Sequence, residues 1–124
     1  MIRILLAEDD DSMRVYLKRA LERTGYGVTA VDGGAAALSL LEAGKYDLLL
    51  TDIVMPELDG IELAQRAAAL HPMMRIMFIT GFAAVALHST AMPPGAKVLS
   101  KPFHLRDLVT EVDRLFQFGN AADI

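Results

Sequence analysis

Cysteine is absent from the 124-residue sequence. Its absence excludes a disulfide framework, a thiolate zinc site and a cysteine nucleophile. Basic residues are also few, since 12 Lys and Arg stand against 16 Asp and Glu and give a formal net charge of −4. Because proteins bind nucleic acids through a basic surface, this acidic chain is not expected to bind them directly.

Long hydrophobic runs are missing as well. No apolar stretch approaches the roughly 18 residues of a membrane-spanning helix, so we expect no membrane insertion and a cytoplasmic location. Linkers, repeats and low-complexity stretches are absent, and the length suits one domain with its own core. We therefore expect a single domain over residues 1–118, a short tail over 119–124 without an effector domain, and a monomer or weak dimer.

Five short apolar runs have the length and composition of β-strands. The first, third and fourth are almost continuously apolar, as in strands that helices cover on both faces. The predicted strands cover residues 2–7, 28–31, 48–51, 76–80 and 98–100.

Segments with a helical spacing of apolar residues lie between and after these runs. The predicted helices cover residues 13–21, 35–43, 61–70, 83–90 and 105–116. Gly25, Gly44 and the pair His71-Pro72 stand where helices should end. Strands that alternate with helices in this way predict an α/β fold, a doubly wound five-stranded parallel sheet with five helices.

Polar side chains stand at the ends of four predicted strands. They are Glu8, Asp9, Asp52, Thr80 and Lys101. Because the carboxyl ends of parallel strands share one edge of a sheet, where doubly wound folds bind ligands, these side chains should meet. Clustered carboxylates repel one another unless a cation joins them, and hard oxygen ligands with room for water favour Mg²⁺.

Each of these residues alone has an ordinary explanation. An acid after a strand often caps the next helix, as Asp10, Asp11 or Ser12 is expected to do here. A lone Lys101 is most often a surface lysine, and a lone Thr80 is most often a strand-end hydroxyl. The joint occurrence of these residue types at four strand ends favours a functional site.

Four segments resemble, in order and spacing, the receiver domain of bacterial response regulators. They are ILLAEDD (4–10), LLLTDIVMPELDGIEL (48–63), FITGF (78–82) and VLSKPF (98–103). The resemblance covers residues 3–118 and is most specific at 52–60 and at Lys101-Pro102. It looks closest to the stand-alone CpdR-type receivers of alphaproteobacteria. It implies the flavodoxin-like receiver fold and a phosphoprotein of two-component, phosphorelay signal transduction.

Carried over residue by residue, the resemblance implies that Asp52 is the phosphoacceptor. It makes Asp9 the principal acid that binds Mg²⁺, with Glu8 and Asp52 assisting and with Val54 as a ligand through its backbone carbonyl. The expected cofactor is therefore Mg²⁺. The expected protein is a phosphoacceptor module that assists its own phosphorylation, not an enzyme.

The resemblance also implies a conformational switch. Thr80 would bind a phosphoryl oxygen, Lys101 would pair with the phosphoryl group, and Pro102 would follow through a cis peptide bond. Receivers usually carry Tyr or Phe three residues before this lysine, where the present sequence has Val98. Phe82 is the candidate for the moving ring instead, and the alternative is that Phe82 only covers the sheet edge.

The function that the resemblance implies is a single-domain response regulator. A histidine kinase or a phosphotransfer protein would load Asp52. Because the chain is acidic and shows no DNA-binding domain, its output would be contact with a partner protein. The CpdR-type resemblance implies an adaptor, active when unphosphorylated, that controls proteolysis by ClpXP.

Three other functions compete with this hypothesis. A passive relay that carries phosphoryl groups between kinases stays open. An aspartyl-nucleophile phosphatase would place a general acid two residues after Asp52, where this sequence has Val54, so it is disfavoured. A dinucleotide-binding module is poorer still, because no glycine-rich loop follows the first strand.

Overall fold

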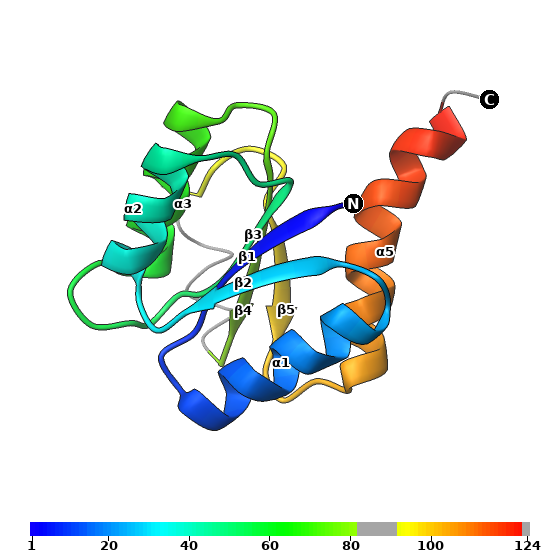
Figure 1. The fold of residues 1–124 in the computed structure, drawn as a ribbon, viewed down its shortest axis with the longest axis horizontal. Coiled ribbons are helices and arrows are strands. Elements are labelled where there is room, and N and C mark those ends of the chain that lie inside the picture. The colour runs from blue at the N-terminus through cyan, green and yellow to red at the C-terminus, as the bar shows by residue number, and fades with distance from the viewer. Residues whose placement is uncertain (82–91, 123–124) are drawn as a thin grey trace.

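The computed structural model describes residues 1–81 and 92–122 and contains one five-stranded parallel sheet (Figure 1). Its strands are β1 (Arg3–Ala7), β2 (Gly27–Val31), β3 (Leu48–Asp52), β4 (Arg75–Thr80) and β5 (Lys97–Ser100). They lie in the order β2-β1-β3-β4-β5. This is the flavodoxin-like order, whose switch point lies between β1 and β3, so the predicted fold class is confirmed.

Helices cover both faces of the sheet. α1 (Asp11–Arg23) and α5 (Leu105–Ala122) lie on one face, and α2 (Gly34–Ala43) and α3 (Gly60–Leu70) lie on the other (Figure 1). The described residues hold these four helices, and the helix expected at 83–90 lies outside them. None of the four is long and apolar enough to cross a membrane.

The apolar strands contribute side chains to two separate hydrophobic cores, because successive side chains of a strand point to opposite faces of the sheet. On β1, Leu5 packs into the core under α2 and α3, whereas Ile4 and Leu6 pack into the core under α1 and α5. On β4, Phe78 and Met77 divide in the same way. Burial on both faces is the reason that these strands are almost continuously apolar.

Aspartates cap two of the helices that start at the carboxyl edge of the sheet. Asp10 caps α1, with its Oδ1 accepting a hydrogen bond of 2.8 Å from the backbone N of Met13. Asp59 caps α3 in the same way, at 2.8 Å from the N of Glu62. Of the three caps considered for α1, the structure selects Asp10, and this cap holds the chain that follows β1 in place.

Two glycines let the loop after β3 pack closely. A Cβ on Gly60 would lie 2.0 Å from the backbone O of Asp52, and a Cβ on Gly34 would lie 2.4 Å from the O of Leu58. Both distances are far below van der Waals contact, so any larger residue would displace backbone. The close contact at Gly60 ties the start of α3 to the end of β3.

The carboxyl-terminal segment differs from its expected form. Helix α5 continues to Ala122 through residues 119–122, which were expected to be a tail. The expected helix end at residue 116 is therefore too early, because a single glycine lowers helix propensity by about 1 kcal/mol without preventing helical hydrogen bonds.

Candidate functional site

Three carboxylates converge at the carboxyl edge of the sheet. One oxygen from each of Glu8, Asp9 and Asp52 lies within 4.8 Å of the other two. The register of the sheet explains this, because Ala7 at the end of β1 is paired with Thr51 of β3. The residues that follow these partners are thus brought side by side at the switch point, where the strand-end pattern predicted a cluster.

The side chain of Asp52 is held at both carboxylate oxygens. Its Oδ1 accepts hydrogen bonds from the backbone N of Ile53 at 2.7 Å and from the N of Val54 at 3.3 Å. Its Oδ2 accepts one from the Nζ of Lys101 at 2.8 Å. Only 11% of the side chain is exposed. The carboxylate is therefore fixed in orientation while one part of it still reaches solvent.

Lys101 lies between two carboxylates. Its Nζ is 2.8 Å from Oδ2 of Asp52 and 3.1 Å from Oε1 of Glu8. Burial alone would lower the pKa of Lys101, but the hydrogen bonds and charges of Asp52 and Glu8 outweigh it and raise that pKa above its ordinary value of 10.5. Lys101 therefore stays protonated. The Lys101–Pro102 peptide bond is cis, as the resemblance implied.

Glu8 is the most buried of the three acids. Its side chain is only 1% exposed, and its Oε2 accepts a 3.3 Å hydrogen bond from the backbone N of Asp10. Burial raises the pKa of Glu8 and the negative charge of Asp52 raises it further, while Lys101 and the Asp10 hydrogen bond lower it in part. The net direction is upward, because the burial of the Glu8 carboxylate outweighs the contacts that stabilise its charged form.

The donor set fits a hard divalent cation. Three carboxylates offer oxygen ligands, and Asp9 is exposed, so its side of the cluster is open to water. Mg²⁺ prefers such oxygen ligands and retains several of its waters. A cation bound here would offset the mutual repulsion of the three carboxylates, so the residues present are compatible with Mg²⁺.

The remaining predicted residues, apart from Phe82, lie in or next to strands β3, β4 and β5. Thr80 is fully buried at the end of β4, and its backbone O accepts a 2.7 Å hydrogen bond from the N of Lys101. Val54 is 56% exposed and follows Asp52 by two residues. Val98 pairs with Phe78 in the sheet and packs against the core under α2 and α3. Phe82 lies outside the described residues.

Two contributors were missed from the sequence. Arg14 of α1 donates from Nη1 to the backbone O of Glu8 at 3.0 Å and from Nη2 to Oδ1 of Asp11 at 2.6 Å. Gly60 is the second contributor, because its missing Cβ makes room for the carbonyl of Asp52. The Asp59-Gly60 pair in the sequence is a signal that could have suggested this close packing. The contacts of Arg14 could not be predicted, because they depend on how α1 lies on the sheet.

Comparisons with known proteins agree with this architecture. The model of the response regulator receiver domain matches residues 4–113. The response regulator receiver protein CpdR of Brucella abortus (strain 2308) is 61% identical over 116 residues, which are 93% of this chain and 97% of that protein. The chain therefore belongs to the response regulator receiver family and is a signalling module of the two-component type.

Solved structures give the same result. A response regulator receiver protein from Sinorhizobium medicae WSM419 matches with a TM-score of 0.87 and 34% identity, over 94% of each chain. TrrA of Thermotoga maritima, a response regulator crystallised with Mg(2+)-BeF, matches with a TM-score of 0.82 and 29% identity, over 93% of this chain and 99% of that one.

Proposed function

We propose that Asp52 accepts a phosphoryl group from the phosphohistidine of a kinase or a phosphotransfer protein. The observation that carries this proposal is the fixed carboxylate of Asp52, which two backbone N–H groups and the ammonium of Lys101 hold beside two further acids. A structural acid would need the hydrogen bonds but not the additional carboxylates, whose repulsion is costly in a buried site.

The reaction places negative charge on negative charge. The bond between the histidine nitrogen and phosphorus breaks, and a bond forms between phosphorus and an oxygen of Asp52. Lys101 is 2.8 Å from that carboxylate and stays protonated, so its charge offsets the charge of the incoming phosphoryl oxygens. The backbone N–H groups of Ile53 and Val54 keep the carboxylate aimed during the transfer.

We assign the binding of Mg²⁺ to Asp9, Glu8 and Asp52, with the backbone carbonyl of Val54 as a further ligand. When bound, Mg²⁺ supplies the positive charge that neutralises the phosphoryl oxygens. The exposed position of Asp9 and the convergence of the three carboxylates support this assignment. The Mg(2+)-BeF complex of TrrA supports it by similarity.

The signal would pass through the ends of β4 and β5. A backbone hydrogen bond already links Lys101 to Thr80. A phosphoryl oxygen that draws in the Thr80 hydroxyl therefore also acts on the segment that carries Lys101. Val98, on the neighbouring strand, has no ring that could turn inward. The proposed role of Phe82 as the moving ring stays a prediction, since that residue lies outside the described part of the chain.

The proposed output is contact with a partner protein. The likeness to CpdR favours an adaptor that controls ClpXP proteolysis and is active when Asp52 is unphosphorylated. A phosphate relay is the competing function. A variant whose output face is altered but which still accepts phosphate separates the two, because an adaptor loses its function and a relay keeps it.

The phosphoacceptor proposal is tested with a small phosphodonor such as acetyl phosphate. We expect an acid-stable, base-labile adduct on the wild-type protein in Mg²⁺, and no adduct on Asp52→Asn or in excess EDTA. Asp47→Asn is the matched control, because this exposed aspartate lies just before β3 instead of at its end. Labelling of Asp52→Asn at the wild-type level would refute the proposal.

A further inference from the structure

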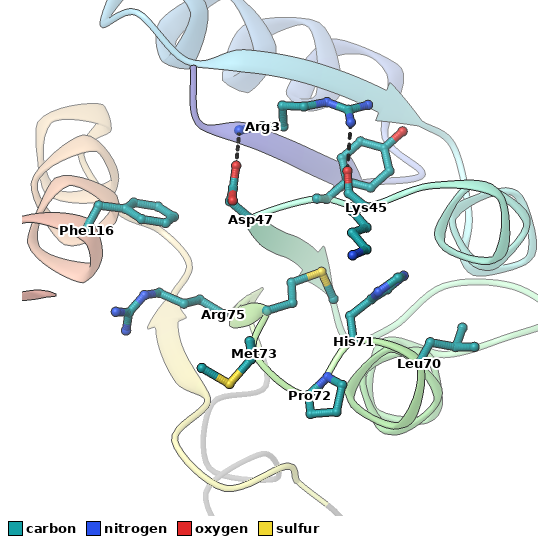
Figure 2. A pocket seen from close by; sticks show the side chains of 11 residues that line it. Arg3, Lys45, Asp47, Leu70, His71, Pro72, Met73, Arg75 and Phe116 are labelled. Atoms are coloured by element: carbon teal, nitrogen blue, oxygen red, sulfur yellow. Dashed lines mark hydrogen bonds between the residues drawn. The ribbon is translucent and has the colours of Figure 1, made fainter.

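A second concave site lies at the opposite edge of the sheet. A pocket of about 590 Å³ lies at the amino ends of β1, β3 and β4, with residues from the end of α3 and from α5 on its walls (Figure 2). Its lining includes Arg3, Lys45, Asp47, Met73, Arg75 and Phe116. None of these residues belongs to the cluster around Asp52, so the proposed function does not use this pocket.

The pocket is positively charged on an acidic chain. Arg3, Lys45 and Arg75 face a single carboxylate, Asp47, whose Oδ2 already accepts a 2.7 Å hydrogen bond from the backbone N of Arg3. Among the described side chains, none of the three cations forms an ion pair with a carboxylate. The local charge favours an anionic ligand although the whole chain carries −4.

Two of the cations are held in place by aromatic rings. The guanidinium of Arg3 lies 4.6 Å from the ring centroid of Tyr46, and its Nη1 donates to the backbone O of Lys45 at 2.8 Å. The guanidinium of Arg75 lies 5.8 Å from the ring centroid of Phe116. Arginine has five N–H donors, so these contacts leave donors for a ligand, and the restricted side chains lose less entropy on binding.

Exposed apolar side chains lie beside the charged residues of the pocket. Met73 is 94% exposed and Leu70 is 44% exposed, and both line the pocket. Met73 and Arg75 also line an adjoining hollow of about 480 Å³ that reaches Pro93 and Pro94. Arginine, methionine and aromatic residues are enriched at protein interfaces. An elongated surface of this composition fits an extended chain better than a compact ligand.

We propose that this surface binds an acidic segment of a partner protein, in which carboxylates flank an apolar side chain. The carboxylates pair with Lys45 and Arg75, and the apolar side chain packs on Met73. Figure 2 shows the ammonium of Lys45 pointing into the open space of the pocket. Because the pocket and Asp52 lie at opposite edges of the sheet, a partner bound here leaves the phosphoacceptor accessible to a kinase.

The test uses the full chain labelled with ¹⁵N and a probe peptide, acetyl-Glu-Glu-Leu-Phe-Glu-Glu-amide. We expect its addition to shift the amide signals of Arg3, Lys45 and Arg75 and to leave those of Asp9 and Asp52 unchanged. Raising NaCl from about 50 to about 300 mM should weaken binding, because exposed ion pairs are screened. A peptide with Lys in place of Glu should not bind.

Charge reversal locates the contact. Lys45→Glu should raise the Kd of the probe roughly fivefold or more, and the milder Lys45→Gln should raise it less. Arg106→Glu is the matched control, because it makes the same charge change at another exposed position. Equal affinity of the Lys45→Glu and Arg106→Glu proteins, shifts confined to the edge around Asp52, or no shifts at millimolar peptide would overturn the proposal.

The same measurement distinguishes the acidic segment from two other possible occupants of the pocket. Tripolyphosphate that shifts the pocket signals with a lower Kd than the peptide would assign the site to small phosphorylated anions and overturn the proposal. Shifts of the same signals on concentrating the protein without peptide would assign the pocket to a second copy of this chain, with the same consequence.

Discussion

The two edges of the sheet differ in how they hold charge. At the carboxyl edge, Glu8 and Asp52 are buried and share the ammonium of Lys101. At the amino edge, Arg3, Lys45 and Arg75 are exposed and form no ion pair among the described side chains. Buried charges need fixed partners, whereas exposed charges are solvated by water and can exchange partners.

The difference suits the two kinds of site that we propose at the two edges of this sheet. A site that performs group transfer needs atoms held to within a fraction of an ångström, and burial with hydrogen bonds provides this at the carboxyl edge. A site that recognises a segment of chain gains from accessible cations beside apolar surface, as at the amino edge. Substitutions at equivalent places on the two edges should therefore have unequal effects.

The largest effect is expected on the rate of phosphorylation when Lys101 is replaced. Lys101→Ala removes the positive charge beside Asp52 and should slow phosphorylation by about 100-fold, the loss seen when one preorganised donor is removed from a reacting site. Lys97→Ala, at the amino end of the same strand β5, should leave the rate unchanged. The rate of adduct formation from a small phosphodonor checks both. Equal rates in the two variants would remove the proposed difference between the edges.

The next largest difference is expected in stability, between glycine substitutions at the two edges. Gly60→Ala forces a Cβ against the carbonyl of Asp52, and we expect the free energy of unfolding to fall by about 2–3 kcal/mol. Gly44→Ala, in the segment that leads to the amino end of β3, meets no atom within 4 Å and should be nearly neutral. Urea denaturation of both variants measures this. A neutral Gly60→Ala would show that the loop after β3 can move freely.

Replacing Thr80 should leave phosphorylation intact but weaken the conformational switch that follows it. Thr80→Ala should still form the adduct but should lose roughly 1 kcal/mol of the coupling to β5, because one hydrogen bond to the phosphoryl group is missing. The measurement is the shift of the Val98 and Leu99 amide signals on adding beryllofluoride and Mg²⁺. Thr24→Ala, near the amino edge, should keep the full shift. If Thr80→Ala also keeps it, the signal does not pass through Thr80.

The smallest effect is expected for the lifetime of the adduct. Hydrolysis needs a water opposite Asp52, and the exposed Val54 offers that water no hydrogen bond. We expect slow decay of the wild-type adduct and a several-fold faster decay in Val54→Asn, which can orient the water. Met73→Asn at the amino edge is the control. A wild-type half-life of seconds that Val54→Asn does not alter would contradict this expectation.

Most of the fold followed from hydrophobic periodicity. All five strands were placed within one residue at each end, because a strand buried on both faces leaves an apolar run between polar loops. The end of α5 was missed, since the apolar spacing ends at Phe116 but only the backbone hydrogen bonds decide where the helix ends. The helix expected at 83–90 and the role of Phe82 stay predictions.

The site was predictable in its members but not in its contacts. Strand-end positions brought Glu8, Asp9, Asp52 and Lys101 together, because parallel strands share one carboxyl edge. The sequence contains no sign that Lys101 bridges Glu8 and Asp52, or that Arg14 holds the backbone of Glu8. Those contacts depend on side-chain reach and on the seating of α1, which are set only when the elements pack.

The sequence by itself determined the class of fold, the edge that carries the acids and the residue types available for phosphoryl chemistry. These depend on local pattern and on the polarity of parallel strands, which neighbouring residues already encode. Only the tertiary structure decided which acid is buried, which carboxylates share an ammonium, and that Arg3, Lys45 and Arg75 meet around one pocket. Burial and charge proximity join residues far apart in the chain, so they exist only once the sheet and its helices have assembled.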